Sequence, residues 1–305
     1  MSTRSTLRFL TLTLLASSTL TACNKTPEKP SQPSSNTATS PAPASQNTSS
    51  TTQKTNLNLP TYNVAVMGSN PPYVALNEKG NITGLEVDLL KAIGEKQGFN
   101  VQFNATPFIG ILDTLNSQKA DIVGSGIFLT PERVSKYQPT NPYMQVGLGA
   151  LTLNDRTDIN KIEDLQGKKV LGQKGFFLFE EVLKKDVLKG KVENAIPANT
   201  TFLAVQSIIQ KKGDAAFGVD VSLNDIQKHM DHKVKLKLIQ YPHSTPYYVS
   251  FWVKKGRNDD LLNKINKGLE QINQDGTYAK IMQNWTGKQG GVPNPNVIAT
   301  IPAQP

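Results

Sequence analysis

Cysteine is almost absent from this chain: Cys23 is the only one in 305 residues. A single cysteine allows no internal disulfide and cannot build a thiolate metal site. Histidine is also scarce. His229 and His232 lie three residues apart, but no third metal ligand is evident beside them. We interpret this pair as positive charge at the end of a polar helix, and we expect neither a metal nor a cofactor.

Two further patterns are missing. The formal charge is +9, but the lysines are scattered without interleaved aromatic residues, which disfavours nucleic acid as a partner. Gly124-Ser125-Gly126 lacks the G-x-S-x-G spacing of a nucleophile elbow, and no histidine–acid pair can be assigned to Ser125. The sequence therefore shows no serine-hydrolase motif.

The N-terminus predicts export. Residues 1–22 combine a basic start with an apolar run that is too short to span a bilayer. Leu20-Thr21-Ala22-Cys23 resembles the bacterial lipobox, in which the cysteine becomes the lipidated first residue of the mature chain. The alternative is an ordinary secretory signal followed by a stray cysteine. We expect a lipid-anchored protein of the cell envelope that faces the periplasm or the cell exterior.

The next segment differs in composition. Residues 23–58 are rich in Ser, Thr, Pro, Asn and Gln and contain almost no large apolar side chains. Such a segment buries too little surface to offset the entropy of ordering it. We predict a disordered tether.

From residue 59 to residue 288, apolar patterns of strands and helices alternate, which predicts mainly parallel sheets covered by helices. The first run predicts strands at 62–66, 101–103 and 121–126 and helices at 84–93 and 107–117. The second run predicts strands at 169–171 and 215–219 and helices at 179–185 and 201–210. Two α/β sheets of the same kind are implied.

Thr130-Pro131-Glu132-Arg133 predicts a helix start, with Thr130 as the N-cap and proline at the first helical position. A cation in this first turn opposes the helix dipole. The presence of Arg133 in this turn is explained if the helix N-terminus and the guanidinium both face the carboxylate of a ligand at the carboxyl ends of the strands. The alternative is a surface arginine paired with a neighbouring acid.

An ordered set of short motifs resembles one family, the extracytoplasmic amino-acid-binding proteins (family 3) of bacterial ABC importers, which have the type II periplasmic-binding fold. The resemblance covers nearly all of residues 60–288. It rests on Pro72-Tyr73, Gly84-Leu85-Glu86-Val87-Asp88-Leu89, Thr106-Pro107-Phe108, Lys119-Ala120-Asp121-Ile122, Gly126, Thr130-Pro131-Glu132-Arg133, Asn141-Pro142-Tyr143, Asn273-Gln274-Asp275-Gly276-Thr277-Tyr278 and Trp285.

The resemblance implies two lobes that close around a ligand. Lobe 1 would comprise residues 59–145 and 247–288, and lobe 2 would comprise residues 146–246, with hinges near 143–147 and 247–249. Residues 289–305 are expected to form a disordered tail. The protein would act as a monomer that delivers an amino acid or related small carboxylate to an ABC permease.

The resemblance also implies roles for individual residues. Arg133 matches the arginine that binds the ligand's α-carboxylate, assisted by the backbone around Ser125 and Gly126. Phe108 matches an aromatic shelf under the ligand, and Tyr73 lies at the cleft edge.

The sequence departs from the family pattern at several of these positions. Phe128 stands where a Thr or Ser commonly contacts the ligand, and lobe 2 offers Gln173 and the aromatic Phe177 in place of a Gly-Thr-Thr-like loop. The acid expected to hold the ligand's ammonium is displaced by one residue, to Asp220. Aromatic side chains thus replace polar ones, which indicates a larger or more apolar ligand than glutamine or glutamate, or a ligand with an altered amino end.

Two other functions remain open. Cyclohexadienyl dehydratases share this fold, and aromatic residues around an arginine-bound carboxylate suit a prephenate-like substrate, although no general acid can be assigned. A lipoprotein that keeps the fold for interaction or sensing is the other alternative.

Overall fold

The computed structural model describes residues 58–230, 233–242 and 246–300. The expected signal peptide, Cys23 and the tether up to residue 57 lie outside the described residues, as do Asp231 and His232. No helix in the described ranges has the length and apolar character needed to cross a membrane.

The first sheet has five strands in the order β4-β1-β5-β14-β6. The pairs β1–β4 and β1–β5 are parallel, and β14 pairs antiparallel with both β5 and β6. We call the part of the chain built on this sheet lobe 1. Its strands are β1 (Thr61–Val66), β4 (Asn100–Ala105), β5 (Ile122–Val123), β6 (Gln138–Pro139) and β14 (Trp252–Val253), with a separate small hairpin of β2 (Ala75–Leu76) and β3 (Ile82–Thr83).

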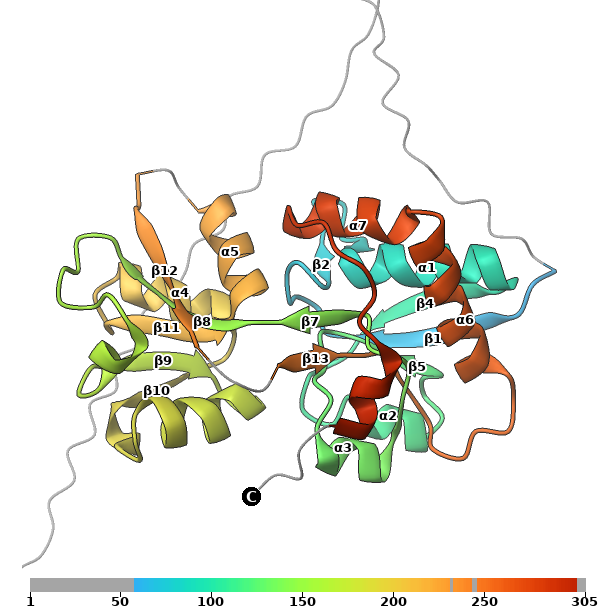
Figure 1. The fold of residues 1–305 in the computed structure, drawn as a ribbon, viewed down its shortest axis with the longest axis horizontal. Coiled ribbons are helices and arrows are strands. Elements are labelled where there is room, and N and C mark those ends of the chain that lie inside the picture. The colour runs from blue at the N-terminus through green and yellow to red at the C-terminus, as the bar shows by residue number, and fades with distance from the viewer. Residues whose placement is uncertain (1–57, 231–232, 243–245, 301–305) are drawn as a thin grey trace, which may run out of the picture. The chain divides into compact units, whose positions relative to one another are not determined.

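The helices of lobe 1 come from both ends of the described chain. Helix α1 contacts both α6 and α7, so the closing segment of the chain packs beside its first helix (Figure 1). The helices are α1 (Leu85–Gln97), α2 (Asp113–Asn116), α3 (Pro131–Lys136), α6 (Leu261–Gln274) and α7 (Thr277–Thr286).

The second sheet has the order β10-β9-β11-β8-β12 and defines lobe 2. The pairs β9–β10 and β9–β11 are parallel, whereas β8 pairs antiparallel with β11 and β12. Its elements are β8 (Leu148–Leu153), η1 (Ile162–Leu165), β9 (Val170–Gln173), the π-helix η2 (Leu178–Val187), η3 (Val192–Asn194), β10 (Ala195–Ala198), α4 (Thr201–Ile209), β11 (Ala215–Val219), α5 (Asp220–His229) and β12 (Leu236–Tyr241).

Two strands run between the lobes. β7 (Met144–Val146) pairs antiparallel with β13 (Tyr247–Val249), with Met144 opposite Val249 and Val146 opposite Tyr247 (Figure 1). The largest buried cluster includes side chains of both sheets, such as Val123 and Val170. The expected two-lobed α/β fold with two connecting strands is confirmed, but its sheets are mixed, because half of the pairings in each are antiparallel.

The expected helix at 107–117 is present only as the short α2. Gly110 has φ +80°, outside the right-handed helical region, and this interrupts the helical backbone. Ile109 beside it is 82% exposed. The apolar pattern of this segment therefore belongs to a turn followed by one helical turn.

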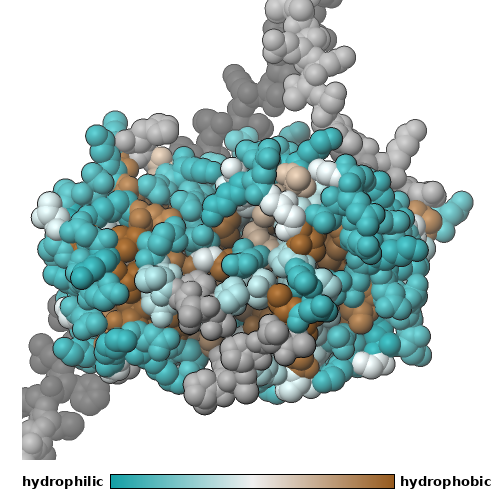
Figure 2. Space-filling view, viewed as in Figure 1, coloured by the Kyte–Doolittle hydropathy of each residue, from teal (hydrophilic) through white to brown (hydrophobic). Residues whose placement is uncertain are grey.

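The C-terminal segment also differs from the expected disordered tail. Val292 and Ile298 pack against the large buried cluster, and Pro295–Thr300 form the short helix η4. The amide of Val292 donates to Asn273 Oδ1 at 3.1 Å. The face of the molecule in Figure 2 is mostly hydrophilic, with apolar patches between the polar side chains.

Candidate functional site

The turn after β5 has an unusual backbone. Ser125 has φ +94° and Gly126 has φ +65°. The Ser125 hydroxyl accepts a hydrogen bond from the amide of Met67 at 2.6 Å, and its carbonyl accepts one from Asn70 Nδ2 at 3.0 Å. A Cβ at position 126 would lie 2.9 Å from the ring of Tyr73, so only glycine fits there. The turn is thus fixed by its neighbours in the loop that follows β1.

The amides of this turn are already bound within the protein. Those of Ser125 and Gly126 both donate to the carboxylate of Glu86, the second at 2.8 Å, and the hydroxyl of Tyr143 donates to the same carboxylate. Glu86 is fully buried, and burial raises its pKa, while the hydroxyl of Tyr143 and the two amides oppose that rise. Glu86 therefore positions the turn, and the two amides expected to assist a ligand carboxylate point at this side chain.

Glu86 belongs to the family motif at 84–89, which by itself gives it no role, but the sequence indicates that this acid is buried. Positions 86, 89, 90 and 93 share one helical face, and Leu89, Leu90 and Ile93 are all buried. An acid in a buried apolar row requires hydrogen-bond donors around it. The structure supplies three.

Arg133 lies in the first turn of α3. Its amide donates to the hydroxyl of Thr130 at 3.3 Å, which confirms the predicted N-cap. Its Nη1 donates to the carbonyl of Phe128 at 3.0 Å. Within the described residues no carboxylate lies in ion-pair distance of this guanidinium, and burial lowers its pKa to about 10, with a small opposing effect of Glu132. The alternative of a surface arginine paired with a neighbouring acid is not what the structure shows.

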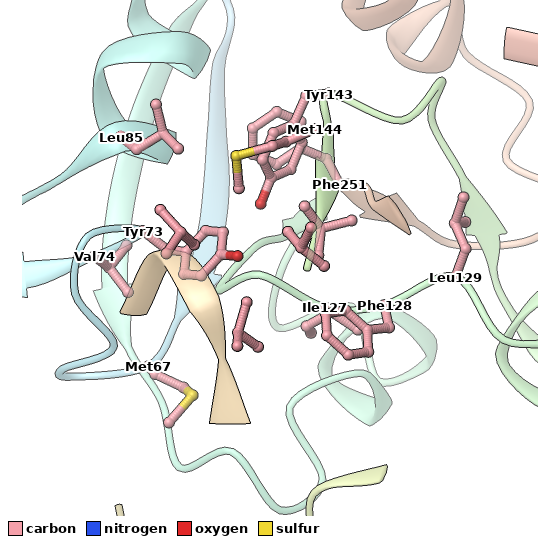
Figure 3. Close-up of a cluster of buried hydrophobic side chains, with 14 of the residues drawn as sticks. Met67, Tyr73, Val74, Leu85, Ile127, Phe128, Leu129, Tyr143, Met144 and Phe251 are labelled. Carbon is pink, nitrogen blue, oxygen red and sulfur yellow. The ribbon is translucent and has the colours of Figure 1, made fainter. Parts of the chain in front are cut away.

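Aromatic side chains meet where the two lobes face each other. Phe176 of lobe 2 contacts Phe108 and Phe128 of lobe 1, with ring centroids 5.6 Å and 5.4 Å apart. Tyr247 on β13 stacks on Phe128 at 5.7 Å and lies 6.2 Å from Phe177. Figure 3 shows Phe128 between Ile127 and Leu129 at this point of lobe 1.

We call these five residues the aromatic cluster. Three of them, Phe108, Phe128 and Phe177, are predicted site residues, and the structure brings them together. Phe176 and Tyr247 were not assigned to the site, although Phe176 belongs to the loop that replaces the family's polar loop.

The hydroxyl of Tyr73 is buried without a hydrogen-bond partner in the described part of the protein. Its ring lies among buried apolar side chains such as Val74 and Leu85 (Figure 3). Burial raises the pKa of Tyr73 well above its usual value, and the nearby carboxylates of Asp220 and Glu86 add to the rise. Tyr73 of lobe 1 and Asp220 of lobe 2 are therefore electrostatic neighbours.

Asp220 is the first residue of α5 and is 8% exposed. Its Oδ1 accepts a hydrogen bond from the amide of Gly147 at 3.2 Å, and its Oδ2 lies 3.3 Å from Nζ of Lys288. Lys288 was not predicted to take part. Gln173, the remaining predicted site residue, is directed elsewhere: its Oε1 accepts from the hydroxyl of Thr201 at 3.3 Å.

The arrangement offers complementary groups for a small molecule. Arg133 presents a guanidinium with no carboxylate partner among the described residues, and Asp220 presents a carboxylate. The aromatic cluster presents apolar rings where the two lobes meet. The described residues contain no group of three His, Cys, Asp or Glu side chains that could hold a metal ion. These are groups suited to binding.

Comparison with known proteins agrees with this chemistry. The model of "Bacterial extracellular solute-binding proteins, family 3" matches residues 62–288. Amino-acid-binding protein AabA of Dichelobacter nodosus is 31% identical over 216 residues, which are 70% of this chain and 83% of that protein.

Solved structures extend the comparison. A structure of an ancestral arginine-binding protein bound to glutamine is 31% identical, with a TM-score of 0.64, and the match covers 75% of this chain and 98% of that one. An ancestral amino acid-binding protein described as a precursor of cyclohexadienyl dehydratase is 29% identical, with a TM-score of 0.65, covering 74% of this chain and 95% of that one. The chain belongs to family 3 of the bacterial extracellular solute-binding proteins.

Proposed function

We propose that this protein captures an amino acid or a related small carboxylate between its two lobes and delivers it to the permease of an ABC importer. The observation that carries the proposal is Arg133, a partly buried guanidinium that has no carboxylate partner in the described chain. A charge of this kind is normally paired. A ligand carboxylate is the partner that a bidentate guanidinium fits best.

Asp220 supports an amino acid as the ligand. Its carboxylate is nearly buried and belongs to lobe 2, whereas Arg133 belongs to lobe 1. A ligand with a carboxylate and an ammonium would satisfy both lobes at once, and the unpartnered hydroxyl of Tyr73 offers a further hydrogen bond beside Asp220.

The aromatic cluster supports a ligand with a sizeable apolar or planar part. Phe176 already contacts both Phe108 and Phe128, so a ligand that enters between the lobes replaces ring–ring contacts with contacts of its own. Small polar amino acids would leave these rings partly uncovered.

The remaining features of the proposal concern the whole chain. We place the lobe boundaries at 59–145 with 247–288 and at 146–246, and we infer a monomer anchored through a lipid on Cys23. The anchor would hold the protein near its permease on the periplasmic or outer side of a membrane.

A thermal-shift screen tests the ligand class. Purified protein is heated with each of the amino acids, with keto acids and with aromatic acids, and hits are confirmed by calorimetry. We expect stabilisation by at least one amino acid or related carboxylate, because a ligand that binds only the folded protein raises its stability. A complete screen without stabilisation would favour the interaction or sensor alternative.

The dehydratase alternative is favoured by one observation, the similarity to the ancestral precursor of cyclohexadienyl dehydratase. It is tested by incubating the purified protein with arogenate or prephenate and measuring dehydration. We expect no turnover, because Glu86, the buried acid nearest the turn, is already bound to three donors.

A further inference from the structure

The end of α7 is built to hold Lys288 in one place. Gly287 closes the helix with φ +70°, and its amide donates to the carbonyl of Gln283. The amide of Lys288 then donates to the buried hydroxyl of Thr286 at 3.1 Å. The backbone that leads into Lys288 is therefore held by hydrogen bonds from two successive amides, those of Gly287 and Lys288.

This side chain crosses from lobe 1 to lobe 2. Its ammonium lies 3.3 Å from Oδ2 of Asp220, whose side chain is 11% exposed, whereas that of Lys288 is 62% exposed. In the described part of the chain, the Asp220 carboxylate accepts from the amide of Gly147, is an electrostatic neighbour of the Tyr73 hydroxyl and contacts this ammonium. Among these three groups, Lys288 is the cation.

A second contact joins the end of α7 to α5. A Cβ built on Gly287 would lie 3.1 Å from Nζ of Lys228, which is in the last turn of α5. The side chains of Asp220 in the first turn of α5 and Lys228 in its last turn thus both reach the end of α7. Figure 1 shows the two helices facing each other across the gap between the lobes.

We propose that Lys288 is an internal counter-ion of Asp220 that holds the two lobes together. The ammonium occupies one oxygen of the carboxylate that a ligand ammonium would use, so this ion pair, which we call the latch, would compete with the ligand for Asp220. The competition with a ligand rests on the proposed function, whereas the contact between Lys288 and Asp220 can be tested without any ligand.

Carbodiimide cross-linking of the full-length, ligand-free protein tests the contact directly. The carbodiimide activates the Asp220 carboxylate, the Lys288 amine attacks it, and an amide forms while the carboxylate oxygen leaves in the urea. We expect a peptide joining Asp220 to Lys288 by mass spectrometry, at a yield that falls in high salt because the ammonium is exposed.

The same sample contains a positive control. Lys96 and Asp275 form an exposed ion pair at 2.6 Å, which should be cross-linked under the same conditions. Detection of the Lys96–Asp275 product without the Asp220–Lys288 product would overturn the proposal. The cross-linking chemistry would then have worked in the sample, and Asp220 and Lys288 would not be in contact.

Small-angle scattering tests whether the pair holds the lobes together. We expect Lys288→Met to increase the radius of gyration of the ligand-free protein and Lys288→Arg to leave it unchanged, since arginine keeps the charge. Lys280→Met is the matched control: Lys280 is exposed on α7, and its ammonium has no ion-pair partner in the described chain. Scattering from Lys288→Met that equals the wild type and the control would mean that Lys288 does not close the lobes.

Discussion

The carboxylate of Glu86 accepts the amide hydrogen of Gly126 at 2.8 Å, which ties the first turn of α1 to the turn after β5. Through the hydroxyl of Tyr143, the same carboxylate also holds the residue that precedes the connecting strand β7. One buried side chain therefore fixes both the turn beside Tyr73 and one entry to the hinge.

Removing this carboxylate should destabilise the protein strongly. Glu86→Ala leaves three buried donors without an acceptor, and each costs about 1–3 kcal/mol, so we expect a loss of at least about 3 kcal/mol in unfolding free energy. Urea denaturation measures it. Glu78→Ala, at an exposed loop position, should change stability by less than about 0.5 kcal/mol. Equal effects of the two variants would mean that the Glu86 contacts contribute nothing.

Glu86 also predicts a pH dependence. Burial raises its folded-state pKa, so in the window above the usual glutamate pKa the folded protein binds more protons than the unfolded chain. The unfolding free energy of the wild type, relative to Glu86→Gln, should therefore fall as pH rises through that window. Denaturation at a series of pH values measures the difference. A rise with pH would show that the hydrogen bonds to the carboxylate outweigh burial.

Arg133→Ala should weaken ligand binding by about 2–5 kcal/mol, or roughly 30- to several-thousand-fold, because it leaves the ligand carboxylate without its charge partner. Arg133→Lys should restore only part of the affinity, since an ammonium cannot meet both carboxylate oxygens. Calorimetry with the ligand found by screening measures both variants. An Arg133→Ala affinity within about threefold of wild type would rule out carboxylate binding by this residue.

Gly126→Ala should be more harmful than Gly80→Ala. Both glycines have positive φ, which costs an alanine about 1–2 kcal/mol. A Cβ at position 80 meets nothing within 4 Å, whereas one at 126 presses on the buried ring of Tyr73, which should add about 1–3 kcal/mol. Unfolding curves of the two variants separate the contact from the backbone strain, and equal losses would contradict the contact.

Cys23→Ala should leave the protein exported but free of the membrane, because the signal is retained and only the site of lipidation is lost. Fractionation of cells that produce the wild type or the variant gives the answer. If both remain in the membrane fraction to the same extent, Cys23 is not the anchor.

The sequence predicted the elements that have strong local signals. Thr130-Pro131 marked the start of α3, the apolar row of α1 marked its buried face, and the strands β1, β9 and β11 were found close to their observed bounds. The mixed strand directions were missed because they depend on pairings such as β5 with β14, which join residues far apart in the chain. The apolar periodicity within one segment does not show which distant strand it pairs with or in which direction.

The candidate site was predictable where a residue's type indicates its chemistry. Arg133, Asp220 and the aromatic residues Phe108 and Phe128 could be proposed from charge, ring and position in the family pattern. Lys288 could not, because its partner is 68 residues away and on the other lobe. The use of the Ser125 and Gly126 amides by Glu86 was hidden for the same reason, since only the folded chain places α1 beside that turn.

The position of β14 has a consequence for the order in which the molecule can be completed. All strands of lobe 2 lie between Leu148 and Tyr241, whereas the sheet of lobe 1 needs Trp252–Val253 between β5 and β6. During synthesis from the N-terminus, β6 has no strand to pair with until β14 has been made, because β14 is its partner in the sheet. Lobe 1, most of whose strands are made first, is thus the last to complete its sheet, and the β5 edge stays unpaired for more than a hundred residues of further synthesis.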